Sequence, residues 1–109
     1  MAASTHATRS ARIAREQRKV HLRLTTQLRA MWAQYERTSA PARPDDFPAV
    51  ADFYAYAEGE FNRRAVTDRR RGFSYAGKRY GWKTTNFGRI HVVDLDTKKM
   101  LVSGPILAI

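Results

Sequence analysis

Residues 9–37 contain neither glycine nor proline, and this uninterrupted stretch constrains the fold more than any other feature of the sequence. Apolar side chains recur along it at steps of three, four and seven residues, at Ile13, Val20, Leu24, Leu28, Met31 and Tyr35. An α-helix brings residues with this spacing onto one face. The opposite face carries Arg12, Arg15, Lys19 and Arg23. The stretch therefore predicts a long amphipathic helix over residues 9–37, preceded by a flexible tail over residues 1–8.

A second helix is predicted after the prolines that end the first. Pro41 and Pro44 disfavour the helical conformation in the residues before them and lack an amide proton. Apolar residues then recur at steps of three and four, at Phe47, Val50, Tyr54, Ala57 and Phe61. This spacing predicts an amphipathic helix over residues 47–71.

Local signals mark the expected ends of this second helix. Asp46 is a suitable N-cap, Pro48 is tolerated in the first turn, and Gly72 is suited to close the C-terminal end. Gly59 weakens the middle of the helix by about 1 kcal/mol relative to alanine, which leaves a kink or break there open.

The hydrophobic period changes from about four to two after Gly72, which indicates β-strands. Strands are expected around Phe73–Tyr75, Tyr80–Trp82, Ile90–Val93 and Met100–Val102. Gly77 marks one turn, and residues 94–99 form a hairpin loop. The sequence thus predicts an α+β fold in one domain over residues 9–109. Two N-terminal helices precede a three- to four-stranded antiparallel sheet over residues 73–109. The predicted core contains Ile13, Val20, Leu24, Leu28, Phe47, Val50, Phe61, Ile90, Val92 and Leu101.

Positive charge is the strongest compositional signal. The chain has 20 Lys and Arg against 10 Asp and Glu, and the charge is segmented. Residues 1–44 carry a charge of +7, residues 45–68 carry −4, and the last twenty residues are balanced. Residues 69–89 contain seven cations and no acid: Arg69, Arg70, Arg71, Lys78, Arg79, Lys83 and Arg89. Such an excess favours an anionic partner.

Aromatic residues lie among these seven cations, a mixture that is typical of nucleic-acid surfaces. Cations neutralise phosphates, and the rings of Tyr75, Tyr80 and Trp82 could stack on bases. The alternative is that these rings face the helices as core and only the cations bind. On the stacking hypothesis, removing Arg79 and Lys83 should weaken binding more than removing Arg12 and Arg15.

Several function classes are not expected. No apolar run reaches the roughly 18 residues of a membrane-spanning helix. The absence of cysteine excludes disulfides, thiolate zinc sites and cysteine nucleophiles. His6, His21 and His91 lack metal-binding spacing, and no glycine-rich phosphate loop is present. We therefore expect no metal, no cofactor and no enzymatic activity.

The sequence thus predicts a non-enzymatic protein that binds DNA or RNA through phosphate-backbone contacts from the first helix and residues 69–89. The alternative is a small inhibitor or adaptor whose basic surface docks on an acidic or nucleic-acid-binding protein complex, such as a host defence complex. A structural subunit of a ribonucleoprotein or virion is a third possibility. In composition the chain resembles small basic proteins of phages, plasmids and bacterial accessory regions. A cytoplasmic location (bacterial, or that of the host cell if phage-encoded), no membrane partner, and a homodimer formed through a sheet edge are further expectations.

Overall fold

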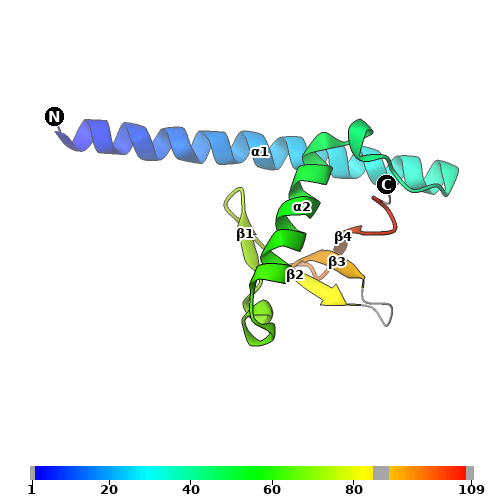
Figure 1. Ribbon diagram of the computed structural model, residues 1–109. Helices are drawn as coiled ribbons and strands as arrows, with labels where there is room; N and C mark the ends of the chain where they lie inside the picture. Colours follow the sequence, from blue (N-terminus) through cyan, green and yellow to red (C-terminus); the bar gives the residue numbers. More distant parts are fainter. Residues whose placement is uncertain (1, 85–88, 108–109) are drawn as a thin grey trace.

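The computed structural model describes residues 2–84 and 89–107, which form helices and one antiparallel sheet (Figure 1). Two α-helices, α1 (Ala2–Thr38) and α2 (Pro48–Arg63), precede the sheet, and each is accompanied by a short 3₁₀ helix, η1 (Pro44–Asp46) and η2 (Val66–Arg71). The strands are β1 (Phe73–Tyr75), β2 (Lys78–Thr84), β3 (Ile90–Asp94) and β4 (Met100–Ser103). The predicted α+β architecture is confirmed.

α1 contains the predicted helix over residues 9–37 and extends it at the N-terminal end. The helix begins at Ala2, so residues 2–8, which were expected to form a tail, have helical backbone. It ends at Thr38 because Ser39 adopts a positive φ of 55° and its amide donates to the carbonyl of Tyr35 at 2.7 Å. With 37 residues, α1 is about 55 Å long.

α2 is shorter than the predicted helix over residues 47–71. It ends at Arg63, the next residue is extended with ψ 149°, and the chain then turns into η2. The helix runs through Gly59 without a break. α2 ends earlier than predicted because its apolar stripe stops at Phe61, and packing therefore does not support the helix beyond that residue.

The N-terminus of α2 is capped by another helix rather than by its own neighbour. The predicted N-cap, Asp46, lies in η1 and binds Arg43 instead. Phe47 occupies the cap position and contributes no side-chain hydrogen bond. The amide of Ala49 donates to Oε1 of Gln27 on α1 at 2.7 Å. The cap was expected from a neighbouring residue, but it comes from a residue far away in the sequence. The prediction that Pro48 lies in the first turn is confirmed.

The sheet is a meander of four strands in the order β1-β2-β3-β4, with every neighbouring pair antiparallel. β1 and β2 are joined by Ala76 and Gly77, whose φ angles of 51° and 79° are typical of a tight two-residue hairpin turn. In the β3–β4 loop, Oδ1 of Asp94 accepts hydrogen bonds from the amides of Asp96 and Thr97. A bulge interrupts the β3–β4 pairing between Val92 and Val93.

The core lies where both helices and the sheet meet. It contains Leu24, Met31, Ala42, Phe47, Val50, Phe53, Ala57, Phe73, Tyr80, Val92, Val102, Ile106 and Leu107. Phe53 is central, since its ring contacts those of Tyr75 and Tyr80 at centroid distances of 5.1 and 4.8 Å. Of the predicted core, Leu24, Phe47, Val50, Ile90 and Val92 are buried, and Leu28, Phe61 and Leu101 are half-buried.

The prediction that Ile13 and Val20 belong to the core is wrong. Their side chains are 54% and 43% exposed. Ile13 lies where α1 projects past the sheet and α2 (Figure 1), and Val20 is exposed although the β1–β2 turn lies beside this part of the helix. The apolar stripe of the helix therefore continues beyond the part that has a packing partner.

None of the helices in residues 2–84 and 89–107 has the length and apolar character needed to cross a membrane.

Candidate nucleic-acid interface

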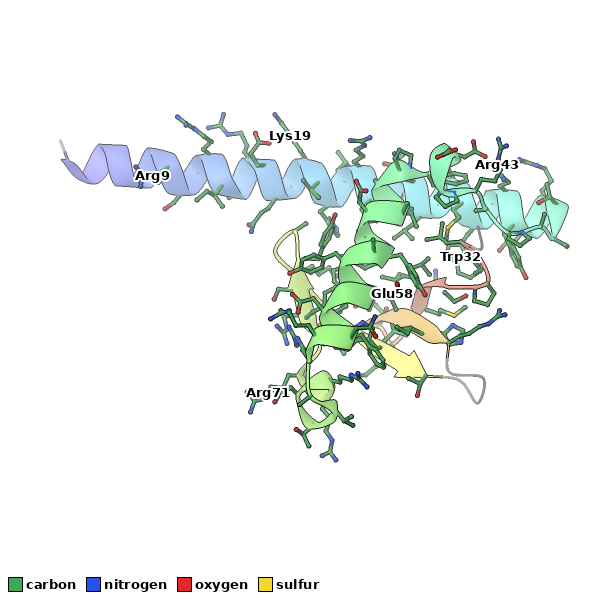
Figure 2. The ribbon with its side chains drawn as sticks, in the orientation of Figure 1. Arg9, Lys19, Trp32, Arg43, Glu58 and Arg71 are labelled. Atoms are coloured by element: carbon green, nitrogen blue, oxygen red, sulfur yellow. The ribbon has the colours of Figure 1, made fainter. Side chains whose placement is uncertain are left out.

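The four cations predicted on the first helix form one exposed row, which we call the arginine face: Arg12, Arg15, Lys19 and Arg23. At 100° per residue they fall on the side of α1 opposite the buried Leu24 and the half-buried Leu28. Figure 2 shows Lys19 pointing away from the sheet and α2. The ion pair between Lys19 and Glu16, at 3.7 Å, is solvent-exposed on both sides and therefore weak. The arginine face is thus available to an anionic partner.

The predicted cations of residues 69–89 are not one surface, because several of them are bonded within the fold. Arg69 donates from Nε to the carbonyl of Phe61 at 2.9 Å, and its guanidinium carbon lies 3.6 Å from the centre of that ring. Lys78 pairs with the buried Asp94 at 2.7 Å. Arg79 donates to the hydroxyl of Ser74 and to the carbonyl of Arg71.

Arg70, Arg71, Lys83 and Arg89 are exposed, but the fold keeps this region apart from the arginine face. α2 begins beside α1, and its 16 residues rise about 24 Å before the chain reaches η2. Figure 2 shows Arg71 at the end of the molecule far from α1. The two basic segments therefore do not form the joint surface that the sequence suggested.

The aromatic residues proposed for base stacking face the interior. Tyr80 is only 2% exposed. Trp82 is half-buried between the rings of Phe61 and Phe73, and its Nε1 donates to the carbonyl of Ala57 at 3.0 Å. Tyr75 is half-buried against Phe53 and Tyr56. The alternative reading of these rings as core accounts for their positions, and base stacking on them would require the core to open.

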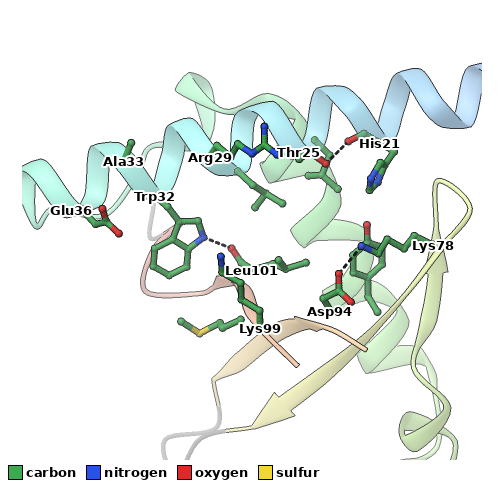
Figure 3. Close-up of a pocket in the computed structure, with 14 residues that line it drawn as sticks. His21, Thr25, Arg29, Trp32, Ala33, Glu36, Lys78, Asp94, Lys99 and Leu101 are labelled. Atoms are coloured by element: carbon green, nitrogen blue, oxygen red, sulfur yellow. Dashed lines mark hydrogen bonds and ion pairs between the residues drawn. The ribbon is translucent and has the colours of Figure 1, made fainter. Parts of the chain in front are cut away.

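A cavity of about 670 Å³ lies between α1 and the sheet (Figure 3). Its lining includes apolar side chains of α1 and β4 together with charged groups: His21, Leu24, Thr25, Leu28, Arg29, Trp32, Ala33, Glu36, Lys78, Tyr80, Asp94, Lys99, Met100 and Leu101. Sequence reasoning missed this site. One available signal was strand alternation, because Lys78 lies two residues before Tyr80 and therefore on the same, inner side of the sheet.

Electrostatics in the cavity centre on Asp94. Burial alone would raise the pKa of Asp94, but hydrogen bonds from Lys78 and from the amides of Asp96 and Thr97 outweigh burial and lower it. Burial, with a smaller contribution from the charge of Asp94, raises the pKa of Tyr80 to about 12. Asp94 is therefore ionised and Tyr80 carries its proton at neutral pH.

Among the described residues, no three His, Cys, Asp or Glu side chains are grouped so that they could hold a metal ion. Comparison with known proteins gives no relative: no family model, no curated protein and no solved structure matches the chain.

Proposed function

We propose that this protein is a non-enzymatic nucleic-acid-binding protein that contacts backbone phosphates through the arginine face of α1. The observation that carries the proposal is the exposure of four cations on one side of a helix whose N-terminal half projects from the body. Lys and Arg side chains that neutralise phosphates release condensed counterions, which favours binding without reading the sequence.

The geometry favours double-stranded over single-stranded nucleic acid. The major groove of B-DNA, about 12 Å wide, admits an α-helix. The β1–β2 turn lies beside Ala14 and Gln17, on the side of α1 away from the arginine face, so a duplex could approach that face without meeting the sheet. Single-strand binding normally uses exposed aromatic rings, whereas Tyr75, Tyr80 and Trp82 are turned inward.

This placement reverses the expected ranking of the two basic segments. Arg79 is engaged with Ser74 and Arg71, and the rings beside it are not accessible. We therefore expect the arginine face to contribute more to binding than residues 69–89.

A charge-matched pair of double variants tests the proposal. Arg12→Gln with Lys19→Gln removes two cations from the arginine face, and Arg70→Gln with Lys83→Gln removes two exposed cations elsewhere. Glutamine has a helix propensity similar to that of lysine and arginine, so α1 should stay intact. Duplex affinity is measured by fluorescence anisotropy across a salt series. The first variant should flatten the slope of log affinity against log salt by about 1.8, and the second should change it little.

Equal losses in the two variants would mean that net charge alone drives binding, which would contradict a defined site on α1. Binding that does not depend on salt would contradict phosphate contacts altogether.

Docking on an acidic protein is the second candidate, and one observation favours it. Leu22 and Ile13 are 67% and 54% exposed on the same helix as the cations. Mixed apolar and basic surfaces suit a protein partner. On this alternative the chain acts as an inhibitor or adaptor of phage or mobile-element type, and Leu22→Ser should weaken partner binding while leaving duplex binding unchanged. The cytoplasmic location and the homodimer remain predictions.

A further inference from the structure

The cavity between α1 and the sheet contains hydrogen-bond donors that the fold does not use. Tyr80 is 2% exposed overall, and it lines the cavity from β2. Lys78 gives one ammonium proton to Asp94 at 2.7 Å and has two more. Buried polar groups are normally hydrogen-bonded, so the Nδ1 of His21, which also lines this cavity and is unpartnered among the described residues, points to a ligand that forms hydrogen bonds there.

Asp94 does not compete for these donors. One of its oxygens accepts from Lys78, and the other accepts from the amides of Asp96 and Thr97. His21, which also faces the cavity, has a buried Nδ1 without a partner in the part of the chain that the structure describes. The floor is therefore polar and incompletely satisfied.

The walls of the cavity are apolar and suit a flat ring. Leu24, Leu28 and Trp32 line it from α1, and Leu101 lines it from β4. Nε1 of Trp32 donates to the carbonyl of Leu101 at 2.7 Å, which holds the indole in place and leaves only its carbon surface for a ligand. A volume of about 670 Å³ lies within the usual range for small-molecule sites.

The mouth of the cavity carries an excess of positive charge. Lys99 and Arg29 line it, opposed by Glu36 alone, since Asp94 is paired with Lys78. Figure 3 shows the side chain of Lys99 reaching toward α1 beside Trp32. An anionic group on the ligand would therefore lie at the mouth, away from Asp94.

We propose that this cavity binds a single nucleotide. The base lies between Trp32 and the leucine side chains, and its acceptors (ring nitrogens and, in cytosine, the carbonyl oxygen) face Tyr80 and Lys78. The phosphate of the nucleotide lies near Lys99 and Arg29. The cavity is on the opposite side of α1 from the arginine face. Nucleotide binding therefore goes beyond the proposed function, and either one can fail while the other holds.

Isothermal titration calorimetry of the full chain tests the proposal with AMP and CMP, against ribose 5-phosphate and inorganic phosphate as ligands without a base. A nucleotide should bind at least about tenfold more tightly than ribose 5-phosphate, because apolar burial of the base adds to the electrostatic attraction. Equal affinities for AMP, CMP and ribose 5-phosphate would overturn the proposal. A 5′-phosphorylated tetranucleotide distinguishes a free nucleotide from the end of a nucleic-acid strand as the ligand. Tight binding of the tetranucleotide supports a strand end, and weak binding supports a free nucleotide.

Two variants locate the site. Tyr80→Phe removes a hydroxyl from the cavity lining and keeps the ring, so the melting temperature should change little, while nucleotide affinity should fall about 3- to 10-fold. Lys99→Gln should weaken binding by a similar factor, and Lys83→Gln, which removes the same charge outside the cavity, should not. Equal effects of the two lysine variants would overturn the proposal, and this comparison holds even if Tyr80→Phe alters the fold.

Discussion

The pair formed by Lys78 and Asp94 links the first and last hairpins of the sheet across its inner side. Asp94 is buried, whereas Lys78 is only half-buried, so removing the carboxylate should cost less than breaking a fully buried pair. The same carboxylate holds the β3–β4 loop through the amides of Asp96 and Thr97. One side chain thus stabilises both a tertiary contact and a local turn.

Stability should therefore fall in acid because of Asp94. Its folded pKa is lowered, so its contribution is present above roughly pH 4 and is lost as the pH falls through the folded pKa. Asp94→Asn should cost about 1–3 kcal/mol at pH 7 and flatten the decline of stability between pH 5 and pH 3. Urea unfolding over that range measures both effects. Asp68→Asn, at an exposed acid, is the control, and an equal change in the two variants would contradict this role.

At the scale of single residues, the sequence shows which side chains are charged but not which of them are bonded within the fold. Arg69 and Lys78 are both cations of one segment, yet one lies on Phe61 and the other is paired with Asp94. Lys78 and Asp94 are 16 positions apart, and only the register of β2 with β3 brings them together. Strand alternation alone could have placed Lys78, Tyr80 and Trp82 on one side.

Among the elements, α2 depends on α1 for a hydrogen-bond partner of an amide in its first turn. The first amides of a helix have no partner within the helix, and Gln27 supplies one from α1. Gln27→Ala should destabilise the protein by about 1 kcal/mol, the usual cost of a lost cap, as measured by urea unfolding. Gln17→Ala, on the exposed part of the same helix, corrects for the higher helix propensity of alanine. Equal stabilities of the two variants would contradict the capping role.

Element boundaries were predictable where local chemistry sets them. Pro41 and Gly77 mark an end and a turn as predicted, whereas Gly72, predicted to close the second helix, closes η2 instead. The end of α2 and its cap were not predictable, because the first depends on where packing stops and the second on Gln27, 22 positions away from Ala49.

For the whole molecule, the arrangement of charge follows from the direction of α2. The helix separates the arginine face from η2, and it presents the exposed acids Asp52 and Glu58 between them. The order of charges along the sequence, positive, negative and positive, is therefore kept in space. This order was readable along the chain, but the separation of the two positive ends was not, since nothing local sets the path of α2.

α1 is one helix by geometry, but its two halves are held by different forces. Residues 24–35 are supported by the core, whereas residues 9–20 have little beside them except the β1–β2 turn near Ala14 and Gln17. They rely mainly on their own backbone hydrogen bonds, and an isolated helix of that length is marginal in water. Amide protons of residues 9–20 should therefore exchange with solvent at least about tenfold faster than those of residues 24–35, as hydrogen–deuterium exchange can measure. Bound duplex should slow exchange in residues 9–20 selectively. Uniform protection along α1 in the free protein would instead mean that the projecting half already has a partner. Selective slowing by duplex would mean that α1 is preformed only where the core supports it and that the rest becomes fully ordered on the target.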